Sequence, residues 1–245
     1  NYSEALMQRI RGHEISMIFQ DPLTSLNPSI RIKTQLIEGL LLDRKMSKKE
    51  VLGYSVDLLR QVGIPEADKR INDYPFKFSG GMQQRVMIAI AISRNPSLLI
   101  ADEPTTAVDV SVQEQILNLL LDLKNKFKMG LIIITHDMGV IAKMCDKVLV
   151  MYAGKIMEIA DTFDLFYNPR HPYTISLLNS IPELSQKSRE KLMNIEGNPP
   201  EMESIPKGCR FHPRCFRKID ICSVKEPELK KVSEGHIYYC WNPIL

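Results

Sequence analysis

Two adjacent carboxylates, Asp102 and Glu103, follow directly after the short apolar run Leu98–Ala101. Such a run is typical of a strand that is buried on both faces of a parallel sheet. A carboxylate at the end of this strand can hold Mg²⁺ beside the phosphates of a nucleotide, and its neighbour can polarise an attacking water as a general base. Acidic pairs also end many ordinary strands, so these two residues alone leave both interpretations open.

A second candidate for chemistry is the glycine-rich segment Ser79–Gln83. Ser79 is a favourable N-cap, and we expect it to begin a helix over residues 80–94. Glycines in the first turn leave the backbone N–H groups and the positive end of the helix dipole accessible, and such a terminus can bind a phosphate. An ordinary capped helix explains the same residues without a ligand.

Three more polar residues lie at the ends of expected elements. Gln20 follows a short alternating strand over 15–19, and His136 follows an apolar strand over 131–135. Gln20 can coordinate Mg²⁺ or the attacking water, and His136 can contact a γ-phosphate. Asp109 is suited to the same region but is equally a good N-cap for a helix that begins at Val110.

The expected elements bring these residues to one edge of a sheet. Apolar residues recur at helical spacing from Val112 to Leu123, which predicts an amphipathic helix between two strands. Strands and helices that alternate in this way predict an α/β fold, whose active groups lie at the carboxyl ends of the strands. Further helices are expected over 33–42 and 48–62, and a hairpin over 147–152 and 155–159.

Composition places the chain in the ordinary range for globular proteins, with 44% hydrophobic and 25% charged residues. The formal charge of +3 is too small to indicate nucleic acid as the main partner. The longest apolar run, Val86–Ile92, is far shorter than the ~20 residues that span a bilayer. We therefore expect any membrane contact to go through a partner.

The character of the sequence changes after about residue 161, where prolines recur and buried-strand runs cease. Four cysteines lie in this part at wide, irregular spacing: Cys209, Cys215, Cys222 and Cys240. Structural zinc sites usually contain closely spaced cysteine pairs, whereas a [4Fe–4S] cluster takes one cysteine ligand on each iron. The spacing favours the cluster, with zinc and free or disulfide-bonded cysteines as alternatives. Because an appendage with little apolar core needs a staple, we expect a structural role.

In their order along the chain, these segments resemble the Q-loop, signature, Walker B, D-loop and H-loop of ABC transporter ATPases, over roughly residues 10–160. The resemblance implies an ABC-type P-loop NTPase core over 1–160, with a helical signature subdomain at about 30–97, and a loop-rich extension over 161–245. Two departures, Phe78 and Val108 in place of the usual Leu, remove no polar group.

The resemblance also implies the role of each site residue. Glu103 and His136 would be the catalytic residues, as base and as γ-phosphate contact, and Asp102 and Gln20 would hold Mg²⁺. The signature of one subunit would close on ATP held by another, so that hydrolysis requires a dimer. The nucleotide-binding residues implied are Gln20, Ser79, Gly80, Gly81, Gln83, Asp102 and Asp109.

Three segments are similar to those of bacterial dipeptide and oligopeptide importer ATPases: 19–28, 168–174 and 208–240. They match an extended Q-loop, a His-Pro-Tyr element and a cysteine-bearing end, and the family supports the [4Fe–4S] assignment. The likeness implies that ATP hydrolysis drives peptide uptake. The implied partners are a second ATP-binding subunit, identical or different, two transmembrane permease subunits and, indirectly, an extracytoplasmic peptide-binding protein, at the cytoplasmic face of the membrane.

No G-x-x-x-x-G-K-[ST] motif occurs in these 245 residues. That loop cradles the phosphates, so we expect an active ATPase only in a full-length protein that includes it, and no tight ATP binding by these residues alone. Two alternative functions stay open: a soluble ABC ATPase of DNA repair or translation, and a truncated iron–sulfur or zinc module that only binds a partner.

Overall fold

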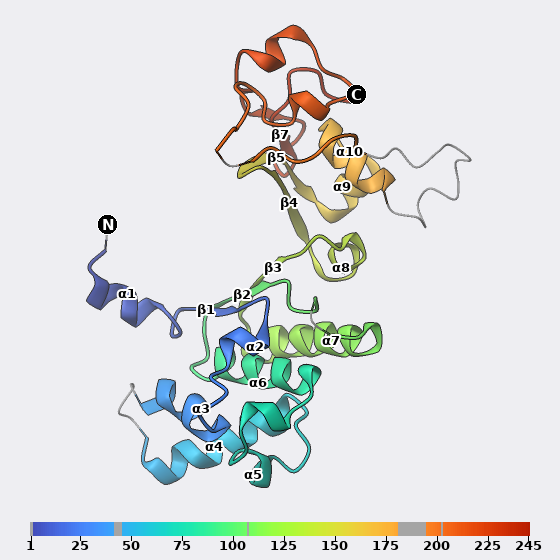
Figure 1. Ribbon diagram of the computed structural model, residues 1–245. Coiled ribbons are helices and arrows are strands. Elements are labelled where there is room, and N and C mark those ends of the chain that lie inside the picture. Colours follow the sequence, from blue (N-terminus) through green and yellow to red (C-terminus); the bar gives the residue numbers. More distant parts are fainter. Residues whose placement is uncertain (1, 42–45, 107, 181–194, 202) are drawn as a thin grey trace. The chain divides into compact units, whose positions relative to one another are not determined.

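The computed structural model describes residues 2–41, 46–106, 108–180, 195–201 and 203–245 (Figure 1). It consists of two compact units, Asn1–His136 and Asp137–Leu245. The first contains α1 (Glu4–Ile10), β1 (Ile15–Ile18), α2 (Pro22–Ser25), α3 (Ile32–Leu41), α4 (Lys48–Gln61), α5 (Ala67–Arg70), η1 (Pro75–Lys77), α6 (Gly80–Ile92), β2 (Leu98–Asp102), α7 (Val110–Phe127) and β3 (Gly130–Ile134). The second contains α8 (Met138–Met144), β4 (Lys147–Tyr152), β5 (Lys155–Asp161), α9 (Thr162–Tyr167), α10 (Pro172–Asn179), η2 (His212–Arg214), η3 (Asp220–Ser223), β6 (Lys230–Lys231) and β7 (Ile237–Tyr238).

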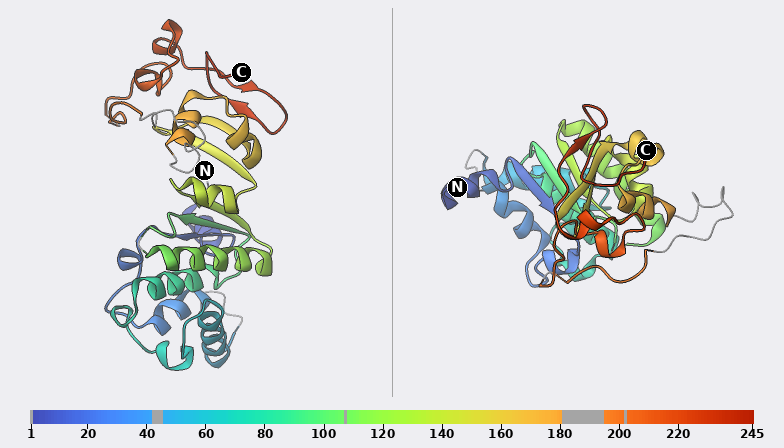
Figure 2. Two further views of the ribbon diagram at one scale, coloured as in Figure 1. Left: turned by 90° about the vertical axis from the view of Figure 1, so that its right-hand side faces the viewer. Right: turned by 90° about the horizontal axis from the view of Figure 1, so that it is seen from above.

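The first unit is built on a parallel sheet in the order β1-β2-β3. Ile18 lies opposite Ala101, and Asp102 lies opposite Ile134. Helices α6 and α7 run along one side of this sheet in both Figure 1 and Figure 2, and Leu99 and Ala101 are fully buried. The predicted α/β architecture with a parallel sheet is confirmed.

Beyond α6 lies a helical part formed by α3, α4 and α5 (Figure 1). Helix α4 begins with a capping box, in which Ser47 and Glu50 bond each other's backbone N–H groups. The helix predicted over 80–94 ends earlier, at Ile92, because Asn95 adopts a left-handed conformation with a φ of 51°.

The second unit contains an antiparallel sheet in the order β4-β5-β7-β6, which joins the predicted hairpin to the end of the chain. Its core centres on Phe211, a fully buried residue between the first two cysteines of the extension. The ring lies 5.2 Å from that of Tyr152 on β4 and 5.0 Å from that of Tyr173 on α10. The hairpin, which precedes the extension, supplies much of this core: Val148, Val150, Tyr152, Met157 and Ala160. The extension therefore packs on the hairpin and does not form a core of its own.

The fully buried carboxylate of Glu158 on β5 joins the His-Pro-Tyr element to the same sheet. Glu158 accepts hydrogen bonds from the backbone N–H groups of Arg170 and His171, at 2.7 and 2.9 Å, and contacts His236 Nε2 at 2.7 Å. His171 Nδ1 in turn accepts from Tyr173 N–H at 3.0 Å and so caps α10. Burial lowers the pKa of His171 to about 4, which keeps its ring neutral.

None of the helices in the described part of the chain is both long and apolar enough to cross a bilayer.

Candidate functional site

The register of the parallel sheet brings three of the predicted site residues together. Gln20 and Glu103 each lie two residues beyond a register pair, Ile18 and Ala101, on adjacent strands. His136 lies two residues beyond the end of β3, the next strand. Because parallel strands end at the same edge, these side chains meet there.

Glu103 is the centre of this group. Gln20 Nε2 donates to Glu103 Oε2 at 2.6 Å, and His136 Nδ1 lies 3.0 Å from Oε1. Thr106 Oγ1 donates to Oε2 at 2.9 Å. We call Gln20, Glu103, Thr106 and His136 the Glu103 cluster.

The cluster keeps the Glu103 carboxylate ionised. Hydrogen bonds from His136 and then Thr106 hold the pKa of this carboxyl below its usual value, although partial burial acts in the opposite direction. An ionised carboxylate, held in place from three directions, can accept a proton from a water molecule.

The backbone at Glu103 is in an unusual conformation for a residue with a side chain, since its φ is 43°. Its N–H donates to the Ile134 carbonyl at 2.9 Å, and its carbonyl accepts from Thr106 N–H at 3.2 Å. The end of β3 and the following turn therefore both fix the backbone at Glu103. Strain of this kind gathers at functional sites.

Asp102, the last residue of β2, is half-buried. Its carboxylate has no hydrogen-bond or ion-pair partner among the residues that the structure describes, so its oxygens can accept a cation or water. Gln20 uses only its amide nitrogen on Glu103, and its carbonyl oxygen can also face a cation. Oxygen ligands of this type suit Mg²⁺.

The glycine-rich segment lines a separate cavity of about 620 Å³, which we call the signature cavity. Helix α6 begins at Gly80 with Ser79 as its N-cap, and the Ser79 side chain makes no capping hydrogen bond. The lining residues come from α6, α7 and the loop between β2 and α7: Ser79, Gly80, Gly81, Met82, Arg85, Thr106, Val108, Asp109, Val112 and Gln115. The cavity thus combines a helix N-terminus with Asp109, as the sequence predicts.

Close packing explains why a glycine stands at position 81. A Cβ at Gly81 would lie 2.8 Å from Cγ1 of Val112, a β-branched side chain on α7 that has little rotamer freedom. Only a residue without a side chain lets α6 and α7 approach this closely beside the cavity.

Gln83, which we predicted to bind nucleotide, does not lie at the signature cavity. Its side chain is only 5% exposed and does not line the signature cavity. Its amide nitrogen donates to the carbonyls of Pro75 and Phe78, at 2.9 and 3.2 Å. In this conformation Gln83 fixes the turn that precedes the signature helix.

The sequence did not single out Thr106 as a site residue. Its hydroxyl binds Glu103, and the same residue lines the signature cavity. Thr106 thus links the two sites. A hydroxyl three residues after a candidate base is the one signal that would have indicated it.

The four cysteines of the extension lie in one region of the second unit. Cys209 N–H donates to the Cys222 carbonyl at 2.9 Å. Cys209, Cys215 and Cys222 are all close enough to Cys240 for their charges to raise its pKa. Burial raises the pKa of Cys209 and Cys215, and that of Cys240 to about 12. Within the described ranges, no three His, Cys, Asp or Glu side chains are close enough together to ligate one metal ion.

Backbone N–H groups near three of these thiols act against the effect of burial and lower their pKa. They belong to Phe211 and His212 for Cys209, to Arg217 for Cys215 and to Asn242 for Cys240. Such N–H groups favour the thiolate, the form that ligates metals. Among the basic residues near these cysteines, the charge of Arg217 acts to lower the pKa of Cys215, whereas Arg210 and Arg214 donate to backbone carbonyls.

Comparison with known proteins gives the same assignment along the chain. The family model described as "ABC transporter" matches residues 3–106, and that described as "Oligopeptide/dipeptide transporter, C-terminal region" matches residues 157–222. The oligopeptide transport ATP-binding protein OppD of Salmonella typhimurium is 52% identical over 244 residues, which cover 100% of this chain and 72% of that protein. The dipeptide transport ATP-binding protein DppD of Bacillus subtilis is 47% identical over 239 residues, covering 98% and 71%.

Solved structures of ATP-binding cassettes are similar to this chain in fold. A dimeric ATP-binding cassette in a post-hydrolysis state, bound to ADP and Pi, superposes with a TM-score of 0.59 at 26% identity, over 66% of this chain and 68% of that chain. The cassette cbiO1 of Clostridium perfringens, part of an ABC transporter complex, gives a TM-score of 0.59 at 26% identity, over 69% and 64%.

Proposed function

The chain belongs to the family of ATP-binding proteins of oligopeptide and dipeptide ABC transporters, and from this premise we propose that it couples ATP hydrolysis to the import of short peptides. The observation that carries the proposal is the Glu103 cluster, in which residues from three strand ends hold one carboxylate. A soluble ATPase of DNA repair or translation has no use for the C-terminal region that matches the peptide transporter family.

In the proposed mechanism, Glu103 accepts a proton from the water that attacks the γ-phosphate. His136 would contact the γ-phosphate and orient Glu103. Asp102 and Gln20 would hold Mg²⁺, which would supply positive charge to offset the phosphate charge. Ser79, Gly80 and Gly81 face the ATP held by a partner subunit, through the free N–H groups at the start of α6. Asp109 lies in the same cavity and would face that partner too.

This arrangement requires an assembly. We propose that the protein pairs with a second ATP-binding subunit, docks on two permease subunits and works at the cytoplasmic face of the membrane. An extracytoplasmic peptide-binding protein would deliver the peptide to those permeases. The dimeric cassette among the similar structures supports the pairing.

The proposal is tested in membrane vesicles that contain the full-length subunit, its permeases and its peptide-binding protein. We expect a radiolabelled tripeptide to enter the vesicles with ATP, and no uptake with a non-hydrolysable ATP analogue. Uptake of nickel or a sugar under the same conditions, with no uptake of peptides, would contradict the peptide assignment.

We also propose that Cys209, Cys215, Cys222 and Cys240 hold a [4Fe–4S] cluster that staples the extension. The wide spacing of the four thiols, their shared buried region and the backbone N–H groups that favour their thiolates support it. Structural zinc sites usually contain closely spaced cysteine pairs, which these four cysteines lack, whereas a [4Fe–4S] cluster takes one thiolate on each iron.

Anaerobic purification tests the cluster. The full-length subunit is expected to contain about four irons and sulfides per chain and to absorb near 400 nm. Cys215→Ser is expected to lose most of the iron and this absorbance, whereas Cys145→Ser, outside the group, is expected to retain both. One zinc per chain, or a colourless protein with full thermal stability, would overturn the proposal.

A further inference from the structure

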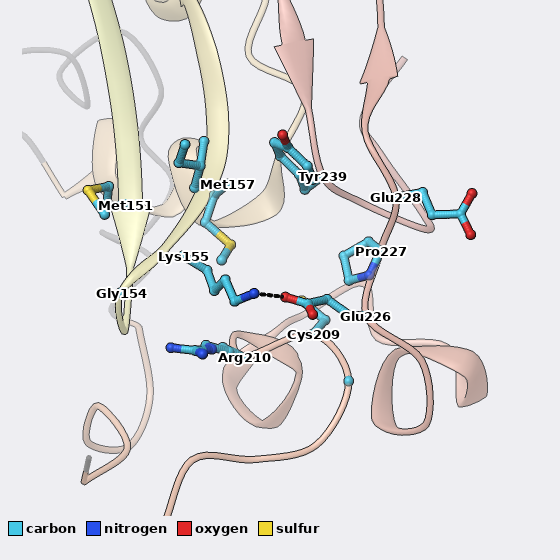
Figure 3. Close-up of a pocket in the computed structure, with 12 residues that line it drawn as sticks. Met151, Gly154, Lys155, Met157, Cys209, Arg210, Glu226, Pro227, Glu228 and Tyr239 are labelled. Atoms are coloured by element: carbon cyan, nitrogen blue, oxygen red, sulfur yellow. Dashed lines mark ion pairs between the residues drawn. The ribbon is translucent and has the colours of Figure 1, made fainter. Parts of the chain in front are cut away.

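We propose that the C-terminal unit carries a second ligand site, which binds a short zwitterionic peptide in the cavity between the β4–β5 turn and the cysteine-bearing loop (Figure 3). The choice of ligand rests on the proposed function, because a peptide that has just been imported is the product to which this unit would be exposed.

The cavity has a volume of about 560 Å³, within the usual range of ~300–1,000 Å³ for small-molecule sites. Its walls come from segments far apart in the sequence: the hairpin around Gly154, the loop at Gly208–Arg210, the segment Glu226–Glu228, and Tyr239. The N–H group of Tyr239 donates to the Met157 carbonyl at 2.9 Å and fixes two of these walls to each other. The cavity is therefore formed by the fold of the unit and not by one mobile loop.

One side of the cavity is apolar. Met151, Met157, Pro227 and Tyr239 line it. In Figure 3, Met157, Pro227 and Tyr239 lie around a common space, and Met151 lies apart from them on the strand at the left. Methionine side chains are flexible and polarizable, so they adapt to apolar groups of different shape. Such a wall suits the varied side chains of short peptides better than a single fixed ligand.

The other side carries charges of both signs. Lys155 Nζ and Glu226 Oε1 form an ion pair at 2.6 Å, drawn as a dashed line in Figure 3, and their side chains are 43% and 56% exposed. The Arg210 guanidinium lies below the hairpin turn and donates to the Ala153 carbonyl. Glu228 points away from this pair and is bonded to Lys225.

This charge pattern matches a zwitterion. A peptide carboxylate can bind Lys155 and Arg210, while the peptide ammonium binds Glu226 and replaces the lysine there. Exposed ion pairs contribute little, so opening the Lys155–Glu226 pair costs little. A simple anion such as phosphate could bind Lys155 and Arg210 but would leave Glu226 without a cationic partner, and an uncharged apolar molecule would leave the charges of both signs unused.

Isothermal titration of the full-length ATP-binding subunit with the dipeptide Leu-Phe tests the site. Saturable binding is expected, and Lys155→Met and Glu226→Gln are each expected to weaken it at least about tenfold. Lys147→Met is the matched control, because Lys147 pairs with Asp161 on the same sheet but outside the cavity. The N-acetylated, C-amidated form of the same dipeptide is also expected to bind at least about tenfold more weakly.

Several outcomes would overturn the site: no saturable binding up to about 5 mM dipeptide, equal affinity for the capped peptide, or an equal loss in the Lys147 variant. Circular dichroism of each variant confirms that it is folded. The uptake experiment separates this proposal from the function. If vesicles import peptides but titration detects no binding, only the cavity site fails. If titration detects binding but vesicles import no peptide, the import function fails.

Discussion

Replacing Glu103 by Gln is expected to lower the ATP turnover of the assembled transporter by about 10²–10⁴-fold. The amide keeps the size of the side chain but cannot accept a proton from water. ATP binding and closure of the dimer do not require this proton transfer, so both are expected to persist. The variant should therefore accumulate as an ATP-bound dimer.

Phosphate release by the full-length transporter measures this effect, and size-exclusion chromatography with ATP measures the dimer. Glu14→Gln is the control, because Glu14 is an exposed carboxylate next to the same sheet, and its side chain contacts His13 and Ser97, which lie outside the Glu103 cluster. Turnover within threefold of the unchanged protein in Glu103→Gln would show that another group accepts the proton.

The pH dependence of the same rate follows from the contacts of Glu103. Because its pKa is lowered in the folded protein, the carboxylate stays ionised, and its contribution to stability is present above the unfolded pKa and lost as the pH falls through the folded one. Thr106→Val removes one of the hydrogen bonds that lower this pKa. The acidic limb of the turnover profile is expected to move to higher pH in that variant.

Replacing Glu158 by Ala is expected to destabilise the second unit by about 3–5 kcal/mol. The fully buried carboxylate accepts from Arg170 N–H and His171 N–H and contacts His236, so its removal leaves buried donors without an acceptor. Glu158→Gln keeps one acceptor oxygen and is expected to cost less, about 1–3 kcal/mol.

Urea unfolding followed by the fluorescence of Trp241, the only tryptophan in these residues, reports on this unit. Glu234→Ala is the control, because Glu234 is an exposed carboxylate two residues from His236. A loss below about 1 kcal/mol in Glu158→Ala would mean that water or another side chain replaces the carboxylate. Hydrogen exchange at the Arg170 and His171 amides would identify that replacement.

Local patterns in the sequence determined most of the first unit. Apolar runs at 98–101 and 131–135 indicated the central strands, and polar residues just after them indicated the site edge. The prediction succeeded because strand burial and helix capping depend on residues close together in the chain. Gln20, Glu103 and His136 met as expected, since parallel strands end at one edge.

The orientations of individual side chains were decided only by the tertiary structure. Thr106 joined the Glu103 cluster because of the left-handed turn at Glu103, and Gln83 turned inward to bind the carbonyls of Pro75 and Phe78. The spacing of a hydroxyl three residues after Glu103 allows the first contact but does not determine it. Both orientations depend on which atoms the fold brings within hydrogen-bonding distance.

The architecture of the second unit was the part of the fold that local sequence patterns predicted least. Glu158 contacts His236 across 78 positions, and β7 pairs with β5 although each of β6 and β7 has only two residues. By itself the sequence determined which side chains can do chemistry and which strands are buried, since residue type and short-range periodicity carry that information. Only the folded chain decided which of those side chains meet, because hydrogen bonds and packing act through space and not along the sequence.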